Sequence, residues 1–475
     1  MRVSRNGLRL IAALLLIWTL IFAFSGCAAF SVRPADTGET GTGNDATAPA
    51  TTAQDEEKEP SAFVALLLAN EEIPAFNRTV LENLHFYYSH YFIGELGTDE
   101  ELAASTAEFY LEYRDLIDET DQNEVTDLLA ESYLAAAGDK YAYYMNPEAY
   151  AEYTSDMTGN YVGIGVQVTN DAVERIITVT AVFPNTPAYE AGVLAGDTIE
   201  AVGDTLASTI SFAELVNRIR GEEGTEVTVT FRRNGETYTR TMTRRTVVQV
   251  TASAKILPGS PKIGLIQITE FDYTTVSQFQ EALDGLLAEG VDGLIFDLRN
   301  NPGGLLSSIL AVLDYMVPNG TPLANYEYYD GTVVSDVASS SSYYGTTVDH
   351  SLPSDLPIAV LCNQHTASAG ELFTCAMQDY AKEGILDAVI VGTVTYGKGT
   401  MQTQVRLGSG CATTISFALY NPPYSPNYEG KGITPDLVVE LSEEAQNKSI
   451  WALTDEEDVQ KTAAINSVSE RVVSE

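Results

Sequence analysis

The chain has 475 residues, enough for two or three domains, and its apolar content is ordinary for a globular protein. Its charge is unusual, because 26 basic residues face 66 acidic ones and give a formal net charge of −40. Such a surface repels phosphate backbones, so we expect no nucleic-acid partner. The acid excess fits a soluble extracellular protein, and it fits the general composition of an acidic proteome equally well.

The first 26 residues have the pattern of a secretory signal peptide. Three arginines precede an apolar run over 10–24, which is shorter than a typical transmembrane helix. The run ends at Ser25-Gly-Cys27, which resembles a bacterial lipobox. The resemblance implies cleavage before Cys27 and a lipid on its thiol, whereas an uncleaved anchor would leave the protein on the same membrane face. We therefore expect an extracytoplasmic protein, lipid-anchored to the outer face of the bacterial cytoplasmic membrane.

Residues 27–60 contain almost no large apolar side chains and many acidic or small ones, which predicts a disordered acidic tether. Residues 61–157 show apolar side chains at helical spacing, which predicts a helical N-terminal region. The helices expected there cover 62–68, 80–93, 102–117 and 125–137. Such a region suits a docking or homodimerisation module, and it suits equally a cap that packs on the next domain.

Short strands separated by turn residues follow over 158–245. The expected strands cover 162–168, 176–182, 198–202 and 226–232, with one helix over 212–219. Gly163-Ile-Gly165 and Pro184-Asn-Thr-Pro-Ala-Tyr-Glu-Ala-Gly-Val-Leu-Ala-Gly-Asp-Thr-Ile199 resemble the corresponding segments of a PDZ domain.

A PDZ domain captures a peptide C-terminus by strand addition, with backbone amides that hold the terminal carboxylate. By position, the resemblance assigns this role to the amides of Val162, Gly163, Ile164 and Gly165. The alternative is a PDZ-shaped spacer whose groove is occluded.

Residues 246–440 alternate strands and helices, which predicts an α/β or α+β core. The expected strands cover 263–268, 293–298, 358–361, 389–391, 405–407 and 412–419, and the expected helices cover 276–287, 305–316 and 369–381. A Tyr- and Ser-rich stretch over 325–351 indicates a hairpin or surface loop. The tail over 441–475 is expected to contain an amphipathic helix over 455–469. The fold class is thus a multidomain α/β (α+β) protein with a helical N-terminal region, a PDZ-like domain and an α/β core.

Three motifs follow expected strands of the core, where α/β proteins place their active sites. The first is Asp297-Leu-Arg-Asn-Asn-Pro-Gly-Gly304. Because Gly303 and Gly304 lack side chains, a substrate can approach their amides closely, as in an oxyanion hole. A plain strand-to-helix turn would explain the same residues.

The second motif, Asn363-Gln-His-Thr-Ala-Ser-Ala-Gly-Glu371, places Ser368 at the expected start of a helix. The positive end of the helix dipole lies there, and the Ala369 amide could donate to a developing oxyanion. Ser368 and Glu371 also match a capping box, which by itself is the better explanation of this serine. Glu371 is more readily explained as a capping residue than as an acid catalyst.

The third motif, Thr395-Tyr-Gly-Lys-Gly-Thr-Met-Gln402, holds a lysine between two glycines. Lysine is a poor base at its unperturbed pKa of about 10.4, but burial in a tight pocket lowers that pKa. A neutral Lys398 could then deprotonate Ser368, with Gln402 orienting the amine. A Gly-Lys-Gly loop alone is usually a solvated turn.

Other catalytic or metal chemistry has weaker support in the sequence. His365 lies three residues before Ser368, but no carboxylate is evidently placed to orient it. Cys362, Cys375 and Cys411 lack the spacing of a zinc or redox site, so we expect buried free thiols. We expect neither a metal nor a cofactor.

Together, and in this order behind the PDZ-like block, the motifs resemble the carboxyl-terminal processing peptidases, a family of Ser-Lys proteases. Asp139-Lys-Tyr-Ala-Tyr-Tyr-Met-Asn-Pro-Glu148 and Gly430-Lys-Gly-Ile-Thr-Pro-Asp436 extend the resemblance, which covers about 130–440. One departure is a long join expected over 382–388, between the serine helix and the lysine strand. We expect this join to bulge outward without displacing the lysine.

The resemblance implies Ser368 as nucleophile, Lys398 as general base and Gln402 as its orienting partner. It places the oxyanion donors at the amides of Ala369 and of one residue of the Gly303–Gly304 pair. It also implies that the PDZ domain gates the dyad.

The sequence therefore predicts a serine endopeptidase that cleaves protein substrates near their C-termini through an acyl-enzyme. The main alternative is a catalytically silent PDZ scaffold that binds protein C-termini at the cell surface, although all three catalytic side chains are present. A second alternative is an esterase or amidase that uses the same dyad on small substrates. A PDZ domain would have no purpose in such an enzyme.

Overall fold

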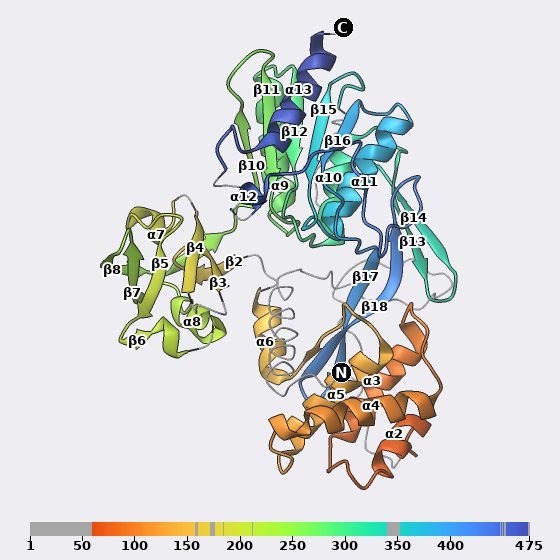
Figure 1. Cartoon of the computed structure of the whole chain (residues 1–475). Helices are drawn as coiled ribbons and strands as arrows, with labels where there is room; N and C mark the ends of the chain where they lie inside the picture. The colour runs from red at the N-terminus through yellow and green to blue at the C-terminus, as the bar shows by residue number, and fades with distance from the viewer. Residues whose placement is uncertain are drawn as a thin grey trace, which may run out of the picture.

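The computed structural model describes residues 59–156, 160–171, 176–183, 185–210, 212–339, 352–446, 448, 450 and 453–473. The expected signal peptide, Cys27 and nearly all of the expected tether lie outside these residues. Within them, no helix combines the length and the apolar character needed to cross a bilayer. Figure 1 shows three parts: a helical region in orange, a PDZ-like domain in yellow-green and an α/β core in green to blue.

The N-terminal region is helical, as predicted. It contains α2 (Ala62–Leu68), α3 (Arg78–Tyr91), α4 (Asp99–Tyr113), the 3-10 turn η1 (Arg114–Leu116) and α5 (Gln122–Ala137). Each α-helix of this set begins at a polar side chain that accepts a hydrogen bond from its first turn: Ser61, Asn77, Thr98 and Asp121. A short strand that the sequence did not predict, β1 (Tyr144–Met145), and the helix α6 (Pro147–Asp156) follow.

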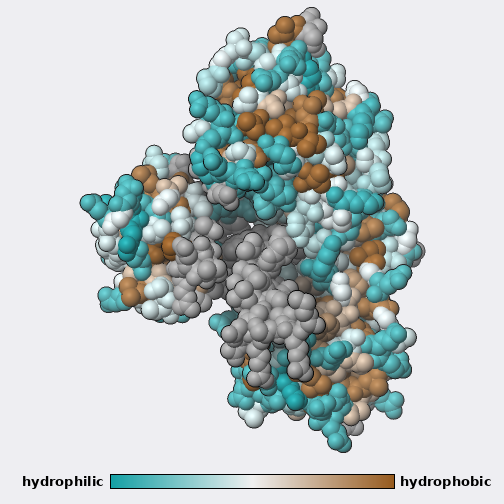
Figure 2. Space-filling view, viewed as in Figure 1, coloured by the Kyte–Doolittle hydropathy of each residue, from teal (hydrophilic) through white to brown (hydrophobic). Residues whose placement is uncertain are grey.

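The PDZ-like domain is a sheet of order β3-β4-β5-β7-β8, with β6 paired to β5. Its strands are β3 (Val166–Asp171), β4 (Ile176–Val182), β5 (Thr198–Val202), β6 (Thr205–Leu206), β7 (Glu226–Arg233) and β8 (Glu236–Thr243). Its helical elements are α7 (Pro187–Glu190), η2 (Ala207–Thr209) and α8 (Phe212–Ile219). Figure 2 shows this domain to one side of the core, with hydrophilic residues over much of its visible surface.

The strand expected over 162–168 is in fact two strands. β2 (Asn160–Gly163) pairs with β9 (Arg245–Val248) in a separate two-stranded sheet. The chain enters the PDZ-like domain through β2 and leaves it through β9. The break lies at Gly165, whose φ is 82°, and a Cβ there would stand 2.2 Å from the Thr186 side chain. Only glycine fits this turn, so the chain bends and pairing resumes in β3.

The core sheet has the order β10-β11-β12-β15-β16-β19, and every strand except β10 runs parallel to its neighbours. These strands are β10 (Ala252–Ile256), β11 (Ile263–Ile268), β12 (Gly293–Asp297), β15 (Ile358–Cys362), β16 (Ala388–Gly392) and β19 (Leu437–Val438). The helices are α9 (Thr275–Ala288), α10 (Leu306–Met316), α11 (Ala369–Lys382), α12 (Glu443–Gln446) and α13 (Val459–Val473). Helices α9, α10 and α11 pack on one face, and α13 packs on the other. All residues of β12 and β15 are therefore buried.

A second sheet joins the core to the helical region. It contains β13 (Pro322–Tyr328), β14 (Val333–Val337), β17 (Thr400–Gly408) and β18 (Cys411–Asn421), with β1 paired to β18. The β17–β18 hairpin runs from the core to the N-terminal helices (Figure 1), where Leu407, Cys411 and Ile415 enter their hydrophobic cluster. The helical region is thus packed on the core.

Candidate active site

The structure brings the three predicted motifs to one edge of the core sheet. β12, β15 and β16 are parallel neighbours, and the three motifs follow their C-terminal ends. The loop to Gly304, the turn to Ser368 and the loop to Lys398 therefore leave the sheet at the same edge, as the sequence predicted.

Ser368 directly precedes α11 in a strained backbone conformation, with φ 53° and ψ −122°. Residues other than glycine rarely occupy this region, and such strain is concentrated at functional sites. The Ser368 amide donates to the Glu371 carboxylate (3.0 Å), and the Glu371 amide donates to the Ser368 carbonyl (2.8 Å). A capping role does not explain the strain. A sharp strand-to-helix turn of this kind presents the nucleophile in the α/β-hydrolases.

The glycine pair lies against this serine. Gly303 has φ 104°, and a Cβ on it would stand 2.6 Å from the Ser368 Cβ and 2.9 Å from the Ala369 nitrogen. Gly304 has φ 135°, and a Cβ on it would stand 2.1 Å from the main-chain oxygen of Phe271. The Gly303 amide itself donates to the Asn301 side-chain oxygen (2.8 Å). Both positions require glycine because neither leaves room for a side chain.

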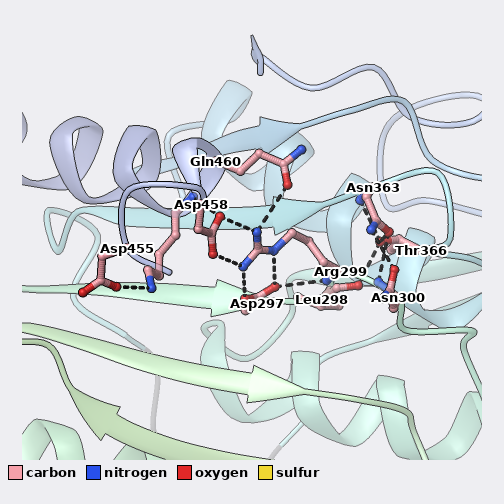
Figure 3. Close-up of polar contacts among 10 residues, drawn as sticks. Asp297, Leu298, Arg299, Asn300, Asn363, Thr366, Asp455, Asp458 and Gln460 are labelled. Atoms are coloured by element: carbon pink, nitrogen blue, oxygen red, sulfur yellow. Dashed lines mark hydrogen bonds and ion pairs between the residues drawn. The ribbon is translucent and has the colours of Figure 1, made fainter. Parts of the chain in front are cut away.

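Polar side chains hold the glycine loop and the serine turn together (Figure 3). The Asn363 side-chain oxygen accepts from the Asn300 amide (3.0 Å), and the Asn363 Nδ2 donates to the Asn300 side-chain oxygen (2.8 Å). The Thr366 hydroxyl donates to the Leu298 carbonyl (2.8 Å). These bonds fix the glycine loop relative to Ser368.

Arg299, in the same loop, is a fully buried cation between two carboxylates (Figure 3). Its Nε and Nη2 donate to Asp297 (2.9 and 2.7 Å), and its Nη1 and Nη2 donate to Asp458 (2.7 and 3.0 Å). Burial disfavours the charged guanidinium, but the two carboxylates outweigh burial and raise the pKa of Arg299. Because Asp458 directly precedes α13, the C-terminal helix is tied to the glycine loop.

Lys398 is buried, with 8% of its surface exposed, in the loop between β16 and β17. The amides of Gly397 and Lys398 donate to the two oxygens of the Glu371 carboxylate (2.6 and 2.8 Å). The Thr395 hydroxyl donates to the same carboxylate (2.5 Å). Burial raises the pKa of Glu371, and these hydrogen bonds act against burial. Since Glu371 also binds the Ser368 amide, one buried carboxylate joins the serine turn to the lysine loop.

The other side of the lysine is fixed by Tyr420, whose hydroxyl donates to the Lys398 carbonyl (2.7 Å). Burial and the nearby Glu371 carboxylate raise the pKa of Tyr420, so its hydroxyl stays a neutral donor. Tyr420 therefore fixes the backbone of the lysine loop.

The glycines on either side of the lysine are also fixed by hydrogen bonds to their backbone groups. The Gly399 amide donates to Glu429 (2.7 Å), and the Asn427 Nδ2 donates to the Gly399 carbonyl (2.9 Å). The Gly397 carbonyl accepts from the Gly430 amide (2.9 Å). Every backbone N–H and C=O group of the lysine and its two neighbours is thus hydrogen-bonded. The backbone of the lysine loop is therefore rigidly held, whereas the sequence alone suggests a solvated turn.

The join between α11 and β16 is fixed by backbone hydrogen bonds to the helix. It folds back on the helix instead of bulging outward, because the amides of Ile385 and Leu386 donate to the Tyr380 carbonyl (2.8 and 3.3 Å). In the lysine loop, the Tyr396 amide donates to the Thr366 carbonyl (3.0 Å) of the serine turn. The lysine loop and the serine turn are therefore in contact.

Gln402 lies in β17, opposite Ser416 of β18. Its side-chain nitrogen donates to the Thr400 carbonyl (3.1 Å), to the Thr400 hydroxyl (3.0 Å) and to the Ser416 hydroxyl (3.2 Å). Ser416 in turn donates to Asp139 of the helical region (2.8 Å). The amide of Gln402 is thereby fixed within the hairpin, and Ser416 links it to the helical region.

The predicted PDZ contacts lie on two structural elements. Val162 and Gly163 belong to β2 and pair with β9, whereas Ile164 and Gly165 form the turn into β3. The Ile164 carbonyl accepts from the Ala188 amide (2.8 Å). In the described part of the domain, β3 is the terminal strand of its sheet.

The weaker candidates of the sequence remain weak in the structure. His365 is exposed, and its ring contacts the Gln364 side chain (3.4 Å). Cys362, Cys375 and Cys411 are buried and unbridged, as predicted, and burial raises the pKa of Cys375 to about 12.

Sequence reasoning missed most of the residues that hold the lysine loop. Glu371 had a recognisable signal, its place three residues after Ser368, but this spacing indicates only a helix cap. Tyr420 and Glu429 have no local pattern that relates them to Lys398. Their roles follow from contacts between segments that are distant in sequence.

Two protein families have models that match this chain. Residues 262–439 match peptidase family S41, and residues 178–233 match the PDZ domain. A carboxy-terminal-processing protease of Bartonella bacilliformis is 32% identical over 307 residues, which cover 64% of this chain and 67% of that protein. A carboxyl-terminal-processing protease of Synechocystis sp. is 29% identical over 347 residues, which cover 72% and 77%. A solved photosystem II D1 C-terminal processing protease aligns with a TM-score of 0.46 and 23% identity, over 80% of this chain and 94% of that one.

Proposed function

The chain belongs to peptidase family S41, the family that its resemblance to the carboxyl-terminal processing peptidases predicted, and on this premise we propose a Ser-Lys endopeptidase that cleaves protein substrates near their C-termini. The observation that carries the proposal is the buried Glu371 carboxylate, which binds the amides of both Ser368 and Lys398. It holds a strained serine and a buried lysine in adjoining turns.

In the proposed mechanism, the neutral amine of Lys398 takes the proton of the Ser368 hydroxyl as the oxygen attacks the scissile carbonyl. The side-chain oxygen of Gln402 accepts from the amine and orients it, because the Gln402 nitrogen is bound to Thr400 and Ser416. Lysine then returns the proton to the leaving amine, and the acyl-enzyme is hydrolysed by a water that the same amine deprotonates.

The developing oxyanion would be stabilised by two backbone amides beside the serine. One is the amide of Ala369, at the start of α11. The other is the amide of Gly304, because the Gly303 amide already donates to Asn301. None of these steps requires a metal or a cofactor.

The PDZ domain would capture the C-terminus of the polypeptide substrate. β3 is the terminal strand of its sheet, so an extended peptide can pair with the outer edge of that strand. The turn from Val162 to Gly165 precedes this strand and would supply amides to the terminal carboxylate. A non-catalytic scaffold would bind the peptide at the same strand edge, but it would not explain the strain of Ser368 or the burial of Lys398.

We also propose that the protein is lipid-anchored through Cys27 on the outer face of the cytoplasmic membrane. The support is the sequence pattern of arginines, apolar run and Ser25-Gly-Cys27. Metabolic labelling with a radioactive fatty acid should mark the wild type and spare Cys27→Ser. Equal labelling of the two proteins would contradict the anchor.

The full-length protein, purified in mild detergent, can be tested on an unfolded polypeptide that ends in apolar residues. We expect Ser368→Ala and Lys398→Met to lose about 10⁴-fold or more in kcat, and His365→Ala to stay close to the wild type. The same polypeptide with a C-terminal amide should be cleaved more slowly, because the amide removes the carboxylate that the PDZ domain recognises.

Two results would decide against the proposal. Equal cleavage by the wild type, Ser368→Ala and Lys398→Met would exclude the dyad. Tight binding of the polypeptide without cleavage by the wild type would support the scaffold.

A further inference from the structure

The segment after α5 reaches from the helical region into the lysine half of the site. α5 ends at Ala137, and the left-handed conformation of the capping residue Gly138 (φ 72°) turns the chain out of the helix. The next residues are Asp139, Lys140 and Tyr141. All of them contact groups that hold Lys398 or Gln402, which lie more than 250 positions further along the chain.

Tyr141 makes the most direct contact. Its ring centroid lies 5.0 Å from the Lys398 Nζ, which stands over the face of the ring. Its hydroxyl donates to the Glu429 carboxylate (2.8 Å) and lies 3.3 Å from the Gly397 carbonyl. Burial, with the hydrogen bond to Glu429, raises the pKa of Tyr141, so its hydroxyl stays a neutral donor.

The other two residues of the segment act on the same loop and hairpin. Lys140 pairs with Glu429 (2.6 Å), and Glu429 also accepts from the Gly399 amide (2.7 Å). Asp139 accepts from the hydroxyl and the amide of Ser416 (2.8 and 2.9 Å). Ser416 in turn accepts from the Gln402 side chain. The segment therefore contacts Lys398 directly and is linked to Gln402, its proposed partner, through Ser416.

We propose that Tyr141 is a positioning residue for the general base, and that the helical region completes the active site through it. The inference rests on the proposed function, in which Lys398 exchanges a proton with Ser368. The negative face of an aromatic ring attracts an ammonium group and does not attract a neutral amine to the same degree. The ring would therefore stabilise the lysine in the cationic form that exists after it has taken the serine proton.

The hydroxyl of Tyr141 has a separate role. Through Glu429 and the Gly397 carbonyl, it fixes the backbone that carries the lysine. The ring affects the equilibrium between the charged and the neutral Lys398 amine, and the hydroxyl affects the position of that amine. Different substitutions of Tyr141 therefore separate the two effects.

The test is the dependence of kcat and KM on pH for the full-length protein with an unfolded polypeptide substrate. Tyr141→Leu keeps a large apolar side chain over the amine but removes the ring. We expect the ascending limb of its kcat profile to move to lower pH by roughly 0.5 to 1 pH unit, with KM nearly unchanged. Tyr141→Phe keeps the ring, so its limb should stay in place while kcat falls roughly five-fold.

Tyr144→Leu is the matched control, because the Tyr144 hydroxyl donates to Asp127 within the helical region (2.8 Å). Its profile should coincide with that of the wild type. If Tyr141→Leu does not fold, fluorinated phenylalanines at position 141 keep the shape of the ring while weakening its negative face. The limb should then move further with each added fluorine.

Two outcomes would overturn the inference, and they can be told apart. A folded Tyr141→Leu variant, or a fluorinated series, with the pH profile of the wild type would remove the role of Tyr141 and leave the Ser-Lys mechanism standing. Full activity of Lys398→Met would overturn the proposed function and the inference with it.

Discussion

The serine half and the lysine half of the candidate site are built in different ways. The serine turn and the glycine loop follow neighbouring parallel strands, and short polar side chains such as Asn300, Asn363 and Thr366 join them. The lysine loop is fixed by side chains from separate parts of the chain, among them Glu371, Tyr420, Glu429 and Tyr141. The first half is a product of the α/β core, whereas the second requires the helical region as well.

The difference shows how a lysine can be given a fixed position. A lysine side chain has four flexible bonds, so its position depends on how rigidly its backbone is held. Here all backbone groups around Lys398 are hydrogen-bonded, and two of them share the Glu371 carboxylate with Ser368. Glu371 is therefore the point at which the two halves meet.

The largest effect is expected in the serine half, from Arg299→Met. The substitution leaves the buried carboxylates of Asp297 and Asp458 without their cation, which should lower the free energy of unfolding by about 3–5 kcal/mol. Urea unfolding at pH 7 measures this loss. The control is Arg232→Met, which breaks an exposed pair with Glu200 and should leave the free energy of unfolding nearly unchanged. Similar losses in the free energy of unfolding for the two variants would show that the buried ion pairs of Arg299 stabilise the fold no more than an exposed pair does.

A change at the junction of the two halves should affect both stability and rate. Glu371→Gln keeps the shape of the side chain but turns one acceptor into a donor that faces backbone N–H groups. We expect a loss of roughly 2–4 kcal/mol in the free energy of unfolding and a loss of kcat of about 100-fold. Glu383→Gln, exposed just beyond the same helix, should match the wild type in both measurements. A Glu371→Gln enzyme with normal kcat would show that the halves do not depend on this carboxylate.

The stability of the serine half should depend on pH through Glu270. Phe271, the next residue, bonds the Gly303 carbonyl through its amide (2.8 Å), so this segment supports the glycine loop. Burial and the nearby Asp272 raise the pKa of Glu270 to about 7, above the value near 4.5 expected when the chain is unfolded. The folded state therefore favours the protonated form, and stability present below pH 4.5 is lost as the pH rises through 7.

Glu270→Gln tests this linkage. At pH 8 the variant should be more stable than the wild type by roughly 2–3 kcal/mol, and the difference should vanish toward pH 4.5. Chemical unfolding across this pH range is the measurement. Glu281→Gln, on the exposed side of α9, should show no such trend. A pH-independent difference for Glu270→Gln would contradict the assigned pKa.

The smallest effect is expected in the lysine half, from Asp139→Asn. Asparagine keeps one acceptor for Ser416 but places an amide group against the other donor, which loosens the Ser416 contact to Gln402. We expect kcat to fall about ten-fold while KM stays nearly constant, because the substrate-binding surface is unchanged. Asp127→Asn, which also lies in the helical region but contacts Tyr144 and Asn146, serves as control. Equal kcat values for the two variants would show that the contact between Asp139 and Ser416 does not affect the lysine half of the site.

Much of the fold could be read from local patterns. Apolar spacing located the helices of the N-terminal region, and the alternation of strands and helices identified the α/β core. The boundaries failed where tertiary contacts override those patterns. β17 begins at Thr400, five residues earlier than expected, because pairing with β18 buries polar side chains such as Gln402 and Thr403. β2 and β3 are separate because Gly165 must pack against Thr186.

By itself, the sequence determined the chemical groups of the candidate site. Ser368, Lys398, Gln402 and the Gly303–Gly304 pair each belong to a short motif after a strand, and parallel strands bring such motifs to one edge. Only the tertiary structure decided how the lysine is held. Its supports come from Tyr141, from Tyr420 and from two carboxylates, and none of these has a fixed sequence spacing from it. Side-chain contacts between distant segments follow no period, so they become visible only when the packed chain brings them together.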